Sequence, residues 1–206
     1  MQASYNDMPP KKQLIIGALH DLIAAGSSPE SVTVSEIASK AGIGKGTIYE
    51  YFSCKEEIFR EGVIATSVYH LKNMSGILES CEGYRETLAK MAEYILKIVN
   101  KNKVFFEFIL KDFDSGNKYR FCEIRRDFIS TYKDDISKLV NGLIQKGIDE
   151  GIISSMPERS KIEFASFSAL SYLIYSRPDE PGLFGSVYSE DEIKNLSCEM
   201  YTKIIC

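Results

Sequence analysis

The sequence lacks the motifs that mark the common enzyme classes. It contains no G-x-S-x-G elbow, no Walker loop, no G-x-G-x-x-G turn and no H-E-x-x-H metal site. Histidine is scarce as well: His20 and His70 are the only two, and neither has a partner at the helical spacing of a metal site. We therefore expect that the protein is not an enzyme and needs no cofactor and no metal.

Long apolar runs are also missing. No run approaches the roughly 20 residues that a membrane span needs, and the first residues lack the apolar core of a signal peptide. Hydrophobic residues make up 44% of the chain and charged residues 26%, which is typical of a globular protein. These features predict a protein that stays in the cytoplasm and has no membrane partner.

Cysteines are few and scattered. The five in the chain are Cys54, Cys81, Cys122, Cys198 and Cys206, and no two of them form a C-x-x-C pair. An odd and scattered set favours reduced thiols over a disulfide framework. A redox-sensing or metal-binding role is the alternative.

Positive charge is in short supply. The chain has 25 lysines and arginines against 29 acidic residues, a net charge of −4. This balance alone disfavours a nucleic-acid-binding protein, because phosphates attract clustered lysine and arginine. Between Thr33 and Arg60 the two signs balance at four residues each. Any DNA binding by this segment must therefore depend on a few well-placed contacts.

The sequence has helical periodicity from end to end. Apolar residues between Lys11 and Ala25 recur at the spacing of one buried helical stripe, and strand-like alternation is absent. Further helices are expected at about 83–100, 104–113, 118–150, 157–176 and 190–205. We predict an all-α fold.

A sharp turn separates two short helices near the N-terminus. Thr33 and Glu36 have the spacing of a capping box that starts a helix. Gly42 follows where the chain needs a left-handed residue, which glycine adopts without a steric penalty. Ile48 and Phe52 then mark the apolar side of the next helix. Two short helices joined by a tight glycine turn predict a helix-turn-helix.

Other capping boxes organise the rest of the chain. Ser53 with Glu56 predicts the start of a long helix near Lys55, and Ser155 with Glu158 and Ser189 with Glu192 repeat the spacing. We expect two domains. Residues 1–54 form a three-helix head, and residues 55–206 form a larger helical body.

The segment from Thr33 to Phe59 resembles the DNA-binding signature of the TetR family of transcriptional regulators. The residues that carry the resemblance are Thr33, Ile37, Ala38, Ala41, Gly42, Ile43, Gly44, Lys45, Gly46, Thr47, Ile48, Tyr49, Tyr51, Phe52, Lys55, Glu56 and Ile58. The resemblance is specific over residues 11–60 and only architectural beyond them. The chain departs from the family at Gly44, where serine is usual, and at Cys54, where serine or asparagine is usual.

The resemblance implies a transcriptional regulator, in particular a repressor, that binds a palindromic operator in double-stranded DNA as a homodimer and is released by a small-molecule effector. A recognition helix in the major groove would direct Lys45 and Thr47 at base edges. Gly46 would let the backbone approach the DNA. Phosphate contacts are predicted for Tyr49, Tyr51 and Lys55.

Glu50 is an awkward residue in a recognition helix, because a carboxylate is repelled by phosphate. Two interpretations remain open at this stage. The side chain either accepts a hydrogen bond from a cytosine amine or points away from the DNA.

The body offers a dimer interface and an effector pocket. Helix 157–176 is apolar nearly all round, and the family resemblance implies that it and helix 190–205 pack against their copies as a four-helix bundle; completing a monomer core is the alternative. The resemblance also implies a pocket for a small apolar or aromatic effector. Its predicted lining residues are Tyr94, Phe105, Phe108, Arg125 and Phe128. Alternatively, these aromatic residues only fill a core.

Two other functions are compatible with the sequence. One is a TetR-like DNA-binding protein with a structural or cell-division role and no small effector. The other is a helical enzyme or adaptor whose head binds protein, which the missing catalytic motifs disfavour.

Overall fold

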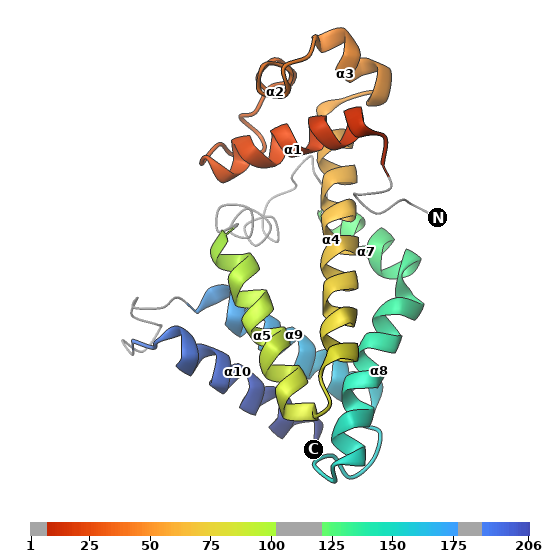
Figure 1. The fold of residues 1–206 in the computed structure, drawn as a ribbon, viewed down its shortest axis with the longest axis vertical. Helices are drawn as coiled ribbons and strands as arrows, with labels where there is room; N and C mark the ends of the chain where they lie inside the picture. The colour runs from red at the N-terminus through yellow and green to blue at the C-terminus, as the bar shows by residue number, and fades with distance from the viewer. Residues whose placement is uncertain (1–7, 102–120, 177–186) are drawn as a thin grey trace. The chain divides into compact units, whose positions relative to one another are not determined.

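The computed structural model describes residues 8–101, 121–176 and 187–206. Within these ranges every regular element is a helix, so the predicted all-α fold is confirmed (Figure 1). The helices are α1 (Pro10–Ala24), α2 (Val34–Ala41), α3 (Lys45–Tyr51), α4 (Lys55–Ser80), α5 (Tyr84–Lys101), α7 (Phe121–Thr131), α8 (Lys133–Asp149), α9 (Arg159–Tyr175) and α10 (Glu190–Ile205). None of the described helices is long and apolar enough to cross a membrane.

The chain forms two compact units. The first comprises residues 1–72 and 102–133, and the second comprises residues 73–101 and 134–206. The predicted helix 118–150 is in fact two helices, α7 and α8, which meet at a bend at Tyr132. Asp134 and Asp135 occupy the first turn of α8, where negative charge is favourable for the helix dipole.

The helix-turn-helix forms as predicted. The Thr33 hydroxyl accepts a hydrogen bond from the backbone N–H of Glu36 at 3.2 Å, and the Glu36 carboxylate accepts one from the backbone N–H of Thr33 at 2.7 Å. Gly42 ends α2 with φ +67°, the left-handed conformation that suits glycine. The N–H of Ile43 then donates to the carbonyl of Ala38 at 3.0 Å. These local bonds fix the angle at which α3 leaves α2.

A continuous apolar core holds the first unit together. Its buried residues come from α1, α2, α3, α4 and α7, and include Ile15, Leu19, Ile37, Ile48, Phe52, Ile58, Phe59 and Ile124. Phe128 and Tyr132 pack against this core from α7 and its end. The core therefore includes residues about 75 positions downstream of the helix-turn-helix.

The only two histidines of the chain lie at the contact between α1 and α4. The Nε2 atom of His20 would be 3.4 Å from a Cβ at Gly62, and the ring of His70 packs edge-on against Tyr69. Burial lowers the pKa of His20, an effect that Asp21 partly offsets. Burial, and then the proximity of His20, lowers the pKa of His70. Both imidazoles are therefore held neutral at pH 7.

We expect these two histidines to make the protein less stable in mild acid. Because each folded-state pKa lies below the unfolded value of about 6.5, the unfolded chain binds more protons as the pH falls. We expect the free energy of unfolding to be constant above about pH 7 and to decrease as the pH drops below 6.5. Urea denaturation between pH 7.5 and 5 measures this.

The matched variant is His20→Gln combined with His70→Gln. It should have a flatter stability profile than the wild type in this pH window, which lies above the usual range of carboxyl pKa values. Parallel profiles for the two proteins would contradict the prediction.

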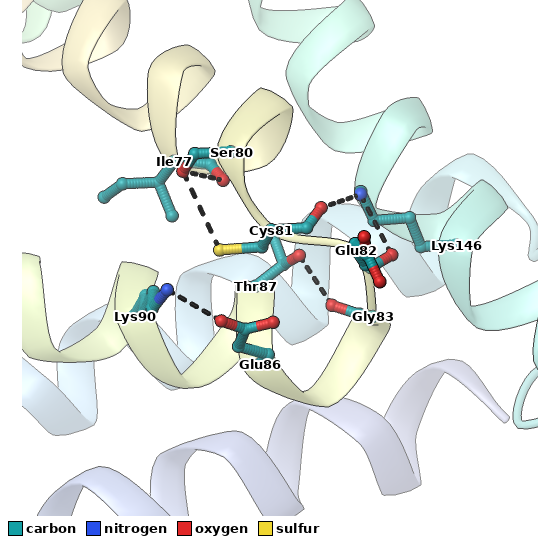
Figure 2. A network of polar contacts seen from close by, with 9 residues as sticks. All are labelled: Ile77, Ser80, Cys81, Glu82, Gly83, Glu86, Thr87, Lys90 and Lys146. Carbon is teal, nitrogen blue, oxygen red and sulfur yellow. Dashed lines mark hydrogen bonds and ion pairs between the residues drawn. The ribbon is translucent and has the colours of Figure 1, made fainter.

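A network of polar contacts surrounds the turn between α4 and α5 in the second unit (Figure 2). The Lys146 ammonium of α8 donates hydrogen bonds to the carbonyls of Cys81 and Glu82, the latter at 3.2 Å. A cation is favourable here because the carbonyls at a helix C-terminus carry partial negative charge. Thr87 completes the first turn of α5 by donating to the carbonyl of Gly83 at 2.7 Å.

Tyr84 connects this turn to the C-terminal helix of the second unit. Its backbone N–H donates to the carboxylate of Glu150 at 2.6 Å, and its buried hydroxyl lies 3.1 Å from the hydroxyl of Thr202 in α10. Burial raises the pKa of Tyr84 to about 12, so the phenol stays protonated. Farther along, α5, α9 and α10 share a core that contains Leu96, Leu173 and Ile193.

The cysteines that the structure describes in full are free thiols. Cys54 and Cys206 are exposed, Cys81 is buried and Cys198 is half-buried. Burial raises the pKa of Cys198 to about 11, which disfavours the reactive thiolate. Cys122 lies among the residues whose side chains are outside the description.

Candidate nucleic-acid interface

The recognition helix α3 has one side in the core and the other in solvent. Ile48 is fully buried, and it anchors the short helix in the first unit's core. On the other side, Lys45, Gly46 and Glu50 are exposed, and Tyr49 is 56% exposed. A large aromatic side chain left in solvent on a short helix is available for a contact outside the protein.

Five of the six predicted DNA contacts come together on α3. Lys45, Gly46 and Tyr49 are exposed, and Thr47 and Tyr51 are half-buried. Tyr51 packs against the first unit's core, so this side chain also helps to hold the helix in place. That these residues contact DNA stays a prediction.

Gly46 has no structural reason to be glycine within the protein. A Cβ at this position would meet no atom within 4 Å, and its φ is not in the left-handed range. Glycine inside a helix costs about 1 kcal/mol relative to alanine. No contact within the described protein offsets this cost, and close approach to DNA stays a predicted benefit of glycine at this position.

Lys55, the sixth predicted contact, has a clear structural role. Its ammonium donates to the carbonyls of Pro29, Glu30 and Val32 at 3.1, 2.9 and 2.8 Å. These bonds tie the first turn of α4 to the loop that precedes α2. Sequence reasoning missed this role because the three acceptors lie more than 20 residues upstream.

Most acidic groups near α3 have partners within the protein. Hydrogen bonds from Thr33 lower the pKa of Glu36, and Glu61 forms an ion pair with Lys12 at 2.8 Å. At the start of α4 the backbone N–H of Ser53 donates to the carboxylate of Glu57 at 2.6 Å. The prediction that Glu56 is the capping-box partner of Ser53 is therefore wrong. The carboxylates that surround the recognition helix are therefore largely structural.

Lys12 is a second cation that is engaged within the first unit. Besides its ion pair with Glu61, its ammonium lies 4.8 Å from the centre of the Phe52 ring, a cation–π geometry. It thereby covers one end of the core at the junction of α1 and α4.

The predicted effector residues are only partly described. Phe105 and Phe108 lie outside the described residues, and so does the side chain of Arg125. Tyr94 is half-buried in α5 of the second unit. Phe128 lies in α7, where it packs against the first unit's core and its ring is 5.1 Å from that of Tyr132. The effector pocket stays a prediction.

An exposed aromatic surface runs along α9. Phe164, Phe167 and Tyr175 are 62%, 60% and 61% exposed, while Ala165 and Leu173 on the other side of the helix are buried. Leu170 is exposed as well. We call Phe164, Phe167, Leu170 and Tyr175 the α9 surface. Exposed apolar side chains on one side of a helix make this surface a candidate interaction site.

The fold and the exposed recognition helix define a helix-turn-helix protein with an additional helical unit. Residues 22–61 match the family model described as bacterial regulatory proteins of the tetR family. This match confirms that the segment resembles the DNA-binding region of the TetR family, and it confirms the predicted helix-turn-helix class. No match is found among curated proteins.

Several solved structures share this fold. The fatty acid degradation regulator FadR from Bacillus halodurans is 17% identical, with a TM-score of 0.68 over 96% of each chain. The transcriptional regulator FadR from Bacillus subtilis, solved in complex with stearoyl-CoA, is 19% identical, with a TM-score of 0.63 over 93% of this chain and 96% of that chain. A proposed fatty acid metabolism regulator from Clostridium perfringens is 25% identical, with a TM-score of 0.58 over the same shares.

Proposed function

We propose that the protein is a cytoplasmic transcriptional repressor that binds a palindromic operator as a homodimer and is released by a small-molecule effector. The observation that carries the proposal is the solvent-facing side of α3. There Lys45 and Tyr49 make no hydrogen bond or ion pair with any described residue, and Gly46 leaves the backbone uncovered. A helix with these properties suits the major groove, which is wide enough to admit it.

Two observations support the proposed dimerisation: the α9 surface and the balanced charge of a single DNA-binding unit. With balanced charge between Thr33 and Arg60, one copy has little sequence-independent attraction to phosphate. Two copies on a palindrome double the specific contacts. The exposed aromatic residues of α9 are the apolar surface that a second copy would cover.

Acyl-CoA thioesters are the first effectors to test. The Bacillus subtilis protein of the same fold was solved with stearoyl-CoA, and two neighbours carry names that refer to fatty acid metabolism. A long acyl chain also agrees with the apolar effector expected from the aromatic residues of the middle helices. An effector releases DNA only if it binds the conformation with low DNA affinity more tightly than the other.

Fluorescence anisotropy with the intergenic DNA beside the protein's own gene tests DNA binding. We expect Lys45→Ala and Tyr49→Ala each to weaken binding about tenfold or more, because each removes a contact to the DNA. Neither should lower the unfolding free energy by more than about 0.5 kcal/mol, as both side chains are exposed.

Lys203→Ala in α10 is the matched control for charge. Lys203 is exposed and belongs to the second unit, so its loss should leave DNA affinity unchanged. Wild-type affinity in both α3 variants would remove the DNA-binding role of these positions. Adding stearoyl-CoA to the wild-type complex then tests release.

A further inference from the structure

Glu50 lies at the centre of the solvent-facing side of α3. Residues two apart in a helix point in nearly opposite directions, since 3.6 residues complete a turn. Ile48 is buried, so Gly46 and Glu50, two residues before and after it, both point outwards. Both are exposed, and they lie one turn apart on the same face. Glu50 therefore faces in the same direction as the uncovered backbone of Gly46.

Glu50 also has no role within the protein that would explain a carboxylate there. It forms no hydrogen bond or ion pair with any residue that the structure describes, whereas Glu36, Glu57 and Glu61 each have a partner. An unpaired negative charge on the outward face of a DNA-binding helix weakens binding to every duplex, because phosphates repel it. It can still improve discrimination among sequences if it rewards one base.

We infer that Glu50 reads a cytosine in each half-site of the operator, which rests on the proposed function. A carboxylate has only hydrogen-bond acceptors. In the major groove, cytosine presents the N4 amine as a donor, while guanine presents two acceptors and thymine one acceptor and a methyl group. Adenine has a donor at N6 but an acceptor beside it at N7, which repels the second carboxylate oxygen. Cytosine is thus the base that suits Glu50.

In vitro selection from a randomised pool of duplexes tests this inference. The wild type should enrich a palindrome with cytosine at one position of each half-site. Glu50→Ala should lose the preference at that position alone. Glu50→Gln should shift it towards adenine, because a glutamine amide pairs with N6 and N7 of adenine. On the selected operator, replacing this cytosine in one half-site should weaken wild-type binding about tenfold or more and leave Glu50→Ala binding unchanged.

Glu56→Gln is the charge-matched control, since Glu56 lies in the first turn of α4, outside the recognition helix. It should strengthen binding to all duplexes alike and retain the selected palindrome. The inference is overturned if Glu50→Ala and Glu50→Gln enrich the wild-type palindrome with its cytosine preference intact. If the wild type enriches no duplex, the proposed function itself fails, and the inference fails with it.

Discussion

Replacing Gly46 by alanine is expected to stabilise the free protein and to weaken its binding to DNA. Alanine is favoured over glycine inside a helix by about 1 kcal/mol, and the added Cβ meets no atom of the protein within 4 Å. If α3 enters the major groove with this side inwards, the same methyl group separates the backbone from the DNA. We expect an affinity loss of about tenfold or more, equivalent to about 1.4 kcal/mol.

Gly76→Ala is the control for this experiment. Gly76 is an exposed helical residue of α4, and a Cβ there also meets nothing within 4 Å. It should stabilise the protein by a similar amount and leave DNA affinity unchanged. Urea denaturation and fluorescence anisotropy measure the two effects. A Gly46→Ala variant that is stabilised and binds DNA with wild-type affinity would show that this side of α3 makes no close approach.

The features that could be predicted from the sequence are those decided within a few residues. The structure contains both capping boxes, Thr33 with Glu36 and Ser189 with Glu192, and the left-handed conformation of Gly42. Each depends on a side chain and a backbone group that are at most three positions apart, or on the conformational freedom of one glycine. The solvent-facing side of α3 was predictable for the same reason, since helical periodicity alone separates it from Ile48.

Capping-box spacing in the sequence did not identify the capping residue where neighbouring side chains could take the same role. Ser155 and Glu158 have capping-box spacing, yet α9 begins at Arg159, and the side chain of the cap residue Glu158 makes no capping hydrogen bond. At the start of α4, Glu57 takes the place predicted for Glu56. Both cases show that the pattern identifies the neighbourhood of a helix start, while the backbone geometry selects the residue.

Roles that depend on distant parts of the chain could not be predicted. The three carbonyl acceptors of Lys55 lie 23 to 26 residues away. The packing of Phe128 against the core of the first unit joins segments separated by about 70 residues. Periodicity assigns such residues to an apolar or a polar face, but it contains no information about which distant element that face meets.

The largest effect is expected from placing a charge on the α9 surface. Phe167→Glu should convert the proposed dimer into a monomer, because two carboxylates would be buried near each other without partners. Phe167 is 60% exposed in the single chain, so the monomer itself should keep its fold. DNA affinity should fall about 100-fold or more, since the second half-site no longer benefits from the first.

Analytical ultracentrifugation and anisotropy on the same samples test both parts of this prediction. Met156→Glu is the matched control, as Met156 is an exposed apolar residue that precedes α9 and is not part of its aromatic surface. It should remain dimeric and bind DNA normally. A Phe167→Glu protein that stays dimeric would place the interface elsewhere. A monomeric variant with wild-type DNA affinity would mean instead that one copy suffices, and that the balanced charge of residues 33–60 does not limit binding.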